Sequence, residues 1–197
     1  VIDGYNVCIF AYGQTGSGKT YTMMGTPQAR GVNVRALTEL FKVTEDRKED
    51  WEYKMSVSML EIYNEQVRDL LVEAGEDGEF EALDIRSTPQ GNVIPGLKEV
   101  PVAKMSDVER LIQISESNRT TAATAMNSAS SRSHSVLQIK ISGKNELSKM
   151  KTSGKLTLVD LAGSERISKS EATGQRLVEA AAINKSLSAL GNVISGL

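Results

Sequence analysis

Cysteine is almost absent from this sequence, and no apolar run is long enough to cross a membrane. The only cysteine among the 197 residues is Cys8, which excludes an internal disulfide and, with it, a disulfide-stabilised secreted domain. Because Cys8 lies within an apolar run, we predict a small buried side chain in a reducing compartment, with a reactive thiol as the alternative. A membrane span needs roughly 20 apolar residues, and neither such a run nor a signal peptide is visible. We therefore expect a protein of the cytoplasm or nucleus.

The remaining composition is typical of an ordinary globular domain. Hydrophobic residues make up 40% and charged residues 24% of the chain, which fits one domain with a sizeable core. The net charge of −2 is unevenly distributed: residues 1–97 hold 9 basic and 16 acidic side chains, and residues 98–197 hold 14 and 9. A basic second half would suit an acidic polymer as partner, and a solvated surface explains the same bias.

Both ends of the sequence are unusual. It starts at Val1 without an initiator methionine, and Ser195-Gly196-Leu197 stops an apolar periodic pattern without a helix-capping signal. We therefore expect a fragment of a longer chain.

A glycine-rich segment follows the apolar run at residues 7–12 and matches the phosphate-binding pattern G-x-x-x-x-G-K-[ST]. Its glycines allow a tight turn in which backbone N–H groups and the following helix N-terminus hold phosphate oxygens. Lys19 is placed to reach the β- and γ-phosphates, and the Thr20 hydroxyl to bind the Mg²⁺ that bridges them. A glycine-rich turn that matches by chance is the alternative. The expected phosphate loop, residues 13–20, consists of Gly13, Gln14, Thr15, Gly16, Ser17, Gly18, Lys19 and Thr20.

Strand and helix patterns are mixed along the chain. Strands are predicted at residues 7–12, 51–63, 135–142 and 155–162, the last two as a hairpin. The run at 7–12 is typical of a parallel strand buried on both faces. Residues 66–71 suggest a short helical turn, and from Gly174 onward apolar residues follow one helical stripe. These patterns predict an α/β fold with a central sheet.

A second candidate for nucleotide chemistry is the segment 160–165. Asp160 ends an apolar strand, where its carboxylate would face the phosphate loop and hold a Mg²⁺-bound water. Gly163 follows three residues later and can bring a backbone N–H against the γ-phosphate. We predict that this segment is a switch that senses the γ-phosphate.

The segment 127–134, Asn127-Ser128-Ala129-Ser130-Ser131-Arg132-Ser133-His134, is dense in hydroxyl groups. Such groups can bond water, Mg²⁺ and phosphate oxygens, which suggests a second sensor. A polar loop leading into a strand is the simpler alternative.

With these segments in this order, the sequence resembles a kinesin motor domain through essentially its whole length. The resemblance rests on residues 13–20, on Asn127 with 130–134, on 160–165 and on 183–191, and residues 3–6 and 60–65 also fit. The stretch 3–20 most resembles the kinesins whose motor lies at the C-terminal end of the chain, a class associated with minus-end-directed movement. Direction itself depends on a neck that this sequence does not contain.

The resemblance implies the fold class and the domain organisation. The fold would be a P-loop NTPase with a central mixed, largely parallel sheet flanked by helices, truncated at both ends. Residues 1–197 would form a partial kinesin motor domain with a phosphate loop at 13–20, switch I at 127–134, switch II at 160–165 and a switch II helix at about 175–195. The family's first strands and later helices are missing from this sequence.

The resemblance also implies roles for switch I. Ser130 and Ser131 would position water and the Mg²⁺ shell, with Ser131 as a metal ligand, and Asn127 would contact the nucleotide. Arg132 would pair with Glu165 across the two switches, because a charge-assisted pair is strongest in a site that closure has partly dried.

Further implied roles concern catalysis and the base. Glu165, or a water that it orients, would accept the proton of the attacking water, and Asn184 would help to hold that water. Tyr21 would stack on the adenine, with a core aromatic as the alternative. We expect the only histidine, His134, to be structural rather than catalytic.

The implied function is a microtubule-dependent motor ATPase whose cofactors are ATP and Mg²⁺. A non-hydrolysing nucleotide- or microtubule-binding module and a truncated product without autonomous motility are the alternatives. The implied partner is the microtubule, without nucleic acid or membrane insertion, and a dimer would form through segments outside this chain. The expected location is the cytoplasmic cytoskeleton, including the spindle. The implied microtubule contacts are Lys169, Arg176, Lys185, Arg86 and Lys98, each an ordinary solvated cation in the alternative.

Overall fold

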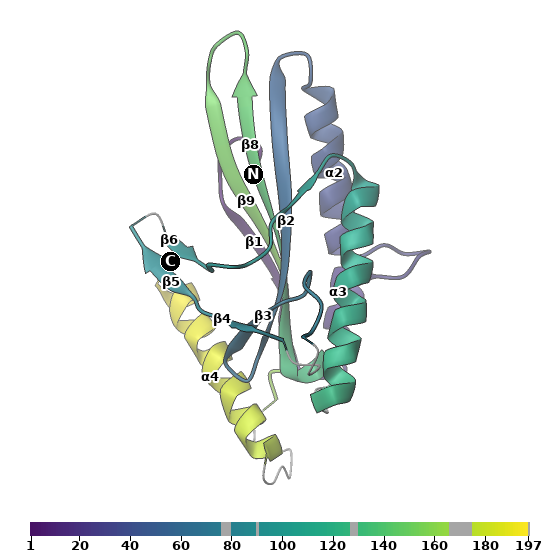
Figure 1. Cartoon of the computed structure of the whole chain (residues 1–197), viewed down its shortest axis with the longest axis vertical. Coiled ribbons are helices and arrows are strands. Elements are labelled where there is room, and N and C mark those ends of the chain that lie inside the picture. Colours follow the sequence, from purple (N-terminus) through teal and green to yellow (C-terminus); the bar gives the residue numbers. More distant parts are fainter. Residues whose placement is uncertain (76–79, 90, 127–129, 166–174, 197) are drawn as a thin grey trace.

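The computed structural model describes residues 1–75, 80–89, 91–126, 130–165 and 175–196 (Figure 1). Its strands are β1 (Val7–Ala11), β2 (Trp51–Tyr63), β3 (Gln66–Asp69), β4 (Ala82–Leu83), β5 (Arg86–Thr88), β6 (Gly91–Val93), β7 (Val100–Val102), β8 (Ser133–Asn145) and β9 (Lys151–Asp160). Its helices are α1 (Lys19–Met24), α2 (Val32–Asp46), α3 (Met105–Met126), the 3₁₀ turn η1 (Ser130–Arg132) and α4 (Gln175–Ser195).

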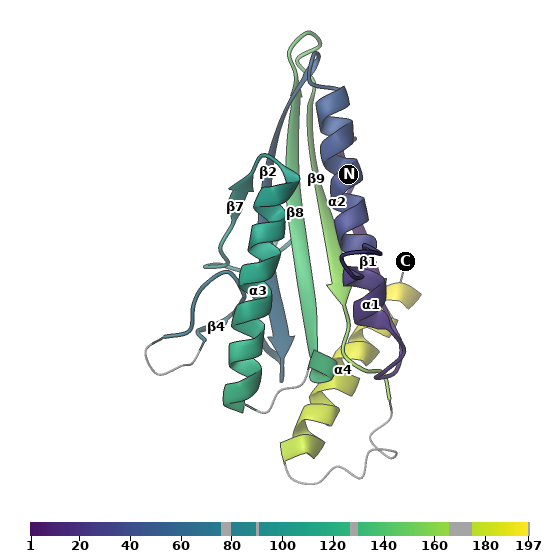
Figure 2. The same ribbon diagram turned by 90° about the vertical axis from the view of Figure 1, so that its right-hand side faces the viewer.

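A seven-stranded sheet in the order β1-β9-β8-β2-β3-β4 organises the chain, with β7 also paired to β2. Helices α2 and α3 lie on one side of this sheet and α4 on the other (Figures 1 and 2). The prediction of a mixed sheet flanked by helices is therefore confirmed. The expectation that the sheet is largely parallel is wrong for the described residues, where only β1 and β9 pair in parallel. Sequence neighbours β2 and β3, and β8 and β9, are joined by short connections, which permit only antiparallel pairing.

Successive side chains of each strand point alternately to a sheet face covered by helices and to a face that is partly open. On the helix-covered face, α2 and α3 pack against odd-numbered residues of β2 and β8 and even-numbered residues of β9, as the period of two along a strand requires. The fully buried members of this core are Met23, Leu37, Val57, Leu70, Val108, Ile139 and Leu158. A smaller cluster on the opposite face contains Leu60, Val67 and Val136. This packing fixes the ends of β1 and β9 beside each other, where the candidate site forms.

Strand β1 lies at the edge of the described sheet and pairs only with β9. Cys8, Ile9 and Phe10 are exposed, so the expectation of a strand buried on both faces is wrong for this chain, as is the prediction of a buried Cys8. An apolar run identifies the strand, but burial requires neighbours on both sides. Partial burial nevertheless raises the pKa of the Cys8 thiol, and the Lys155 cation opposes this only in part.

Residues 66–71 do not form the predicted helical turn. Gln66–Asp69 is strand β3, which pairs antiparallel with the end of β2 through the register Tyr63↔Gln66. Asn64 and Glu65 adopt positive φ values of 49° and 64° and reverse the chain in a two-residue turn. The tight hairpin decides the structure here, because its backbone pairing outweighs local helix propensity.

No helix in the described ranges combines the length and apolar character that a membrane crossing would require.

Candidate functional site

The segment 13–20 connects the end of β1 to the start of α1 and folds back on itself. Ser17 N donates to Gln14 O at 3.1 Å, and the Lys19 ammonium donates to the same carbonyl at 3.0 Å. Gly16 and Gly18 have φ values of 81° and 89°, a left-handed conformation that residues with a Cβ adopt at a cost. The loop therefore has the compact turn that the phosphate-binding pattern predicts.

Thr20 and Asp160 meet beneath this loop, as the sequence predicted. Because β1 and β9 are parallel with Ala11 opposite Asp160, both strands end at the same edge of the sheet. The Thr20 hydroxyl donates to Asp160 Oδ2 at 2.6 Å. Asp160 Oδ1 is buried and has no hydrogen-bond partner among the described residues.

This pair fits the Mg²⁺ that the sequence implies. Hard cations prefer oxygen ligands, and Mg²⁺ is usually held by one or two protein oxygens together with waters and substrate phosphates. A hydroxyl and an unpartnered carboxylate oxygen meet that requirement. No cluster of three or more histidine, cysteine or acidic residues that could hold a metal ion exists within the described ranges.

Glu165 reaches across to the phosphate loop. Its Oε2 accepts from Thr15 N at 2.9 Å and its Oε1 accepts from the Thr15 hydroxyl at 2.6 Å. Partial burial raises the pKa of Glu165, but the two hydrogen bonds from Thr15, the N–H of Glu165 itself and the Lys19 cation together outweigh it and hold that pKa below its ordinary value. The carboxylate is therefore ionised at neutral pH and occupies the rim of the loop.

Gly163 lies where three segments converge. Its N–H donates to Ser131 O at 2.9 Å, and the next N–H, of Ser164, donates to Gly13 O at 3.1 Å. A Cβ at position 163 would come within 2.3 Å of Glu165 Oε2 and of the Thr15 hydroxyl, so a larger residue there would displace the contact between Glu165 and Thr15. The structure thus joins the segments that the sequence singled out, although this Gly163 N–H faces Ser131 rather than an open phosphate position.

The predicted pair between Arg132 and Glu165 is not formed. Arg132 Nη1 instead contacts Glu179 Oε2 on α4 at 2.7 Å, while Glu165 is held by Thr15. Glu179 is only 5% exposed and also accepts a hydrogen bond from the Tyr63 hydroxyl at 2.8 Å. Sequence reasoning missed Glu179. The available signal was its place as the one acidic residue in the otherwise apolar stretch 177–183.

His134 connects the end of β9 to α4. Its Nδ1 accepts the Ala162 N–H at 3.1 Å, so the ring proton lies on Nε2, which is 2.8 Å from the Ser186 hydroxyl. Burial lowers the pKa of His134, the Arg119 cation lowers it further, and Asp160 opposes both. A neutral ring with a hydrogen bond at each nitrogen supports the structural role that we expected.

His134 should make folding stability depend on pH. Its folded-state pKa lies below the ordinary value of about 6.5, so the unfolded chain takes up the proton first. The stabilisation is complete above pH 6.5 and is lost as the pH falls from there toward the folded pKa. Urea unfolding at pH 7.5, 6.5 and 5.5 should show a steeper loss for the natural chain than for His134→Asn, which keeps an acceptor near Nδ1. Equal slopes would contradict this assignment.

The remaining predicted residues lie around this centre. Tyr21 on α1 is 61% exposed, so the alternative of a core aromatic is wrong, and an open ring is free to stack on a base. Ser131 and Asn184 are partly buried on η1 and α4, and Ser130 is the first residue of η1. Asn127 lies outside the described residues.

The implied microtubule contacts are only partly described. Lys169 lies outside the described residues, and the side chain of Arg176 is not described. Lys185 is exposed and pairs with Glu65. Arg86 is exposed on β5, whereas the Lys98 ammonium donates to Leu71 O at 3.2 Å, which gives it a structural contact.

A buried network behind the site was also missed. Arg119 Nε donates to Glu61 Oε1 at 3.0 Å, and its Nη2 donates to the Ser133 hydroxyl at 2.8 Å. This network fixes α3 to the first residue of β8. Glu61 and Arg119 line a cavity of about 490 Å³ that also reaches Thr20 and Asp160.

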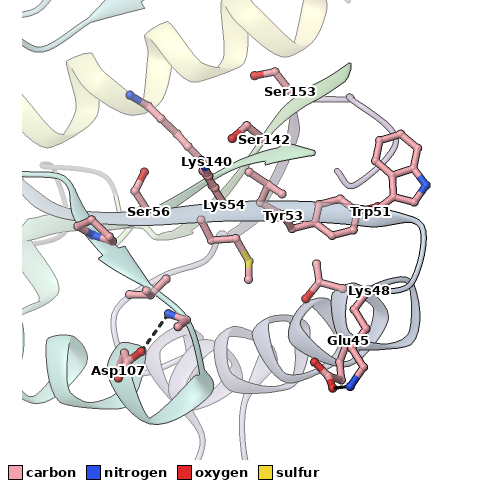
Figure 3. A pocket seen from close by; sticks show the side chains of 16 residues that line it. Glu45, Lys48, Trp51, Tyr53, Lys54, Ser56, Asp107, Lys140, Ser142 and Ser153 are labelled. Atoms are coloured by element: carbon pink, nitrogen blue, oxygen red, sulfur yellow. Dashed lines mark hydrogen bonds and ion pairs between the residues drawn. The ribbon is translucent and has the colours of Figure 1, made fainter. Parts of the chain in front are cut away.

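A larger cavity, of about 840 Å³, lies at the opposite end of the long strands (Figure 3). Trp51 and Tyr53 stack there with ring centroids 5.7 Å apart, and Lys54, Lys140 and Ser142 border the same hollow. Because this end of β2 pairs with the turn end of β8 rather than with the end that meets Asp160, the larger cavity is remote from the phosphate loop. Cavity size therefore does not locate the candidate site in this molecule.

Comparison with known proteins gives consistent matches over the whole chain. The family model for the Kinesin motor domain matches residues 1–197. The chain is 55% identical over 202 residues both to Kinesin-like protein KIN-14H of Arabidopsis thaliana and to Kinesin-like protein KIN-14F of Oryza sativa subsp. japonica. These alignments cover 100% of this chain but 19% and 20% of the two relatives, so it spans about one fifth of their length.

Solved structures agree with the family match. A structure described as that of a fast kinesin superposes with a TM-score of 0.88 at 44% identity, covering 100% of this chain and 56% of the other. A structure described as the C-terminal motor and motor homology domain of Kar3Vik1 gives a TM-score of 0.82 at 41% identity, covering 98% and 48%.

Proposed function

The chain belongs to the kinesin motor-domain family, and from this premise we propose that it forms the ATP-hydrolysing part of a microtubule-dependent motor. The predicted resemblance to kinesins with a C-terminal motor is confirmed by the KIN-14 relatives, and the P-loop NTPase fold by the structural match. The activity of the chain and its partners are our proposal.

The observation that carries the proposal is the convergence of three segments at one edge of the sheet. Thr20 contacts Asp160, Thr15 contacts Glu165, and Gly163 contacts Ser131. The sequence separations between these partners exceed 30 residues, yet all contacts lie around the phosphate loop. A group bound in that loop would touch every one of these segments, which is what coupling of nucleotide to conformation requires.

In the proposed reaction the phosphate loop binds the triphosphate of ATP and Lys19 neutralises its β- and γ-phosphates. Mg²⁺, when bound by Thr20, Ser131 and, through water, Asp160, supplies positive charge that offsets the charge developing on the phosphates. Glu165 leaves Thr15 and accepts the proton of the attacking water, directly or through a second water that Asn184 helps to hold. In the same proposal Ser130 positions water, Asn127 remains a predicted nucleotide contact, and Tyr21 stacks on the base.

The ionised Glu165 of this structure is not in position for that step. It is engaged by Thr15, and Arg132 is engaged by Glu179. We therefore assign this structure to an open arrangement, and propose that the γ-phosphate draws Gly163 inward and brings Arg132 to Glu165. Because Glu179 lies on α4, this exchange removes an ion pair from that helix when the γ-phosphate is bound. In the proposal, α4 is the helix through which the bound nucleotide changes the affinity for the microtubule.

Microtubule binding, dimerisation through segments beyond this chain and a cytoskeletal location complete the proposal. Lys185 and Arg86 are exposed cations suited to an acidic polymer, with an attraction that salt would weaken. Lys169 and Arg176 remain predicted contacts.

The test is release of inorganic phosphate from MgATP by the 197-residue chain with and without polymerised tubulin. We expect stimulation of at least tenfold by microtubules, because closure of the site is coupled to α4. Phosphate release without stimulation would contradict the coupling. Tight nucleotide binding with no phosphate release in a chain with native circular dichroism would favour the non-hydrolysing module instead.

A further inference from the structure

A buried carboxylate joins the end of β2 to helix α4. Glu179 accepts the Tyr63 hydroxyl on Oε1 at 2.8 Å and Arg132 Nη1 on Oε2 at 2.7 Å. Tyr63 and Glu179 are each about 5% exposed. The guanidinium of Arg68 lies 5.1 Å from the centre of the Tyr63 ring, which fixes the ring in place.

The two donors to Glu179 differ in what they can do. Burial, together with the hydrogen bond to Glu179, raises the pKa of Tyr63 to about 12, so its hydroxyl remains a neutral donor at physiological pH. Tyr63 is also part of a continuous strand packed in the sheet. Arg132, in contrast, ends a single 3₁₀ turn, Ser130–Arg132. One donor is held by the sheet, and the other lies in the short turn that the proposed closure would move.

We infer that Tyr63 is a positioning residue that lowers the free energy needed to transfer Arg132 from Glu179 to Glu165. It does so by keeping the buried Glu179 carboxylate hydrogen-bonded after the guanidinium has left. This inference rests on the proposed function, because it takes the Arg132–Glu165 pair as the closed arrangement. A buried carboxylate that loses its last partner carries a large desolvation penalty. Tyr63 removes much of that penalty from the closed arrangement alone, since Glu179 keeps Arg132 in the open one.

Two conservative variants should shift the equilibrium in opposite directions. Tyr63→Phe leaves Glu179 with Arg132 in the open arrangement but without a donor in the closed one, so it disfavours closure. Glu179→Gln weakens the hold on Arg132 in the open arrangement and leaves no buried charge in the closed one, so it favours closure. In the Glu179→Gln background, Tyr63→Phe should have little further effect. A merely structural role would make both variants weaken the same properties.

The experiment compares equilibrium binding of ADP and of the non-hydrolysable analogue AMP-PNP, each with Mg²⁺, to the 197-residue chain and its variants. AMP-PNP carries the third phosphate that closure senses. Its apparent affinity therefore decreases when the fraction of closed protein decreases, and increases when that fraction increases. We expect Tyr63→Phe to weaken AMP-PNP about tenfold and Glu179→Gln to strengthen it several-fold, with ADP affinity unchanged in both. Tyr5→Phe, at an exposed tyrosine whose backbone lies beside Gly154 of β9, is the matched control and should alter neither affinity.

The outcomes separate this inference from the proposed function. Equal effects on ADP and AMP-PNP, or shifts of the same sign in the two variants, would overturn the role of Tyr63 while leaving a nucleotide-binding motor domain intact. If the unmodified chain binds neither ADP nor AMP-PNP, the proposed function is overturned, and the inference with it. Opposite shifts confined to AMP-PNP would support the inference even in a chain that hydrolyses nothing.

Discussion

Replacing Glu165 by alanine is expected to lower ATP turnover by roughly 10²–10⁴-fold, the usual contribution of a general base, while ATP still binds. The reason lies in what Glu165 does in the two arrangements. In the open one it accepts two hydrogen bonds from Thr15 at the rim of the phosphate loop, and in the proposed closed one it accepts the proton of the attacking water. The first contact is dispensable for binding, because its loss only frees the loop. The second requires the carboxylate, which alanine lacks.

The measurement is phosphate release in a single turnover, with ATP affinity determined separately on the same samples. Glu39→Ala, an exposed carboxylate on α2, is the matched control and should leave both quantities within about twofold, as expected of a surface change. Turnover that survives in Glu165→Ala would remove Glu165 from the mechanism. Loss of ATP affinity without a change in the rate at which bound ATP is hydrolysed would make Glu165 a binding residue instead.

Replacing Lys19 by alanine is expected to weaken ATP binding by roughly 10–100-fold and to lower turnover with it. Hydrogen bonds to charged groups contribute about 1.5–3 kcal/mol each, and Lys19 is the cation proposed to lie against two phosphates. In the structure its ammonium is held by a single backbone carbonyl, that of Gln14, at 3.0 Å. That contact is easily exchanged for phosphate oxygens, so the side chain is ready to bind without repacking.

Titration with fluorescently labelled ATP would measure the effect, and Lys42→Ala on the exposed side of α2 is the control. Lys19→Arg should recover little, because the ammonium acts as a compact point charge and a guanidinium is larger and planar. Unchanged affinity in Lys19→Ala would mean that the glycine-rich segment does not hold the triphosphate.

The partner of Arg132 could not be predicted from its neighbours in the sequence, because side chains pair with groups that the fold brings close. Arg132 was expected at Glu165 and lies at Glu179, 47 residues further along the chain. Nothing local distinguishes the two carboxylates as partners. Only the placement of α4 beside the end of β2 brings Glu179 within reach, and only the phosphate loop occupies Glu165.

What the sequence determined by itself is the local chemistry of the site. The glycine spacing of residues 13–20 requires a tight turn before a helix, and an apolar strand that ends in Asp160 requires a carboxylate at the edge of a sheet. These are short-range consequences of backbone freedom and burial, and the structure forms both. The tertiary structure alone decided the antiparallel pairing of β2 with β7 and β8, the exposure of β1 and the partner of Arg132. Each of these depends on which distant segments become neighbours, and that is settled by packing of the whole chain rather than by the pattern of any one segment.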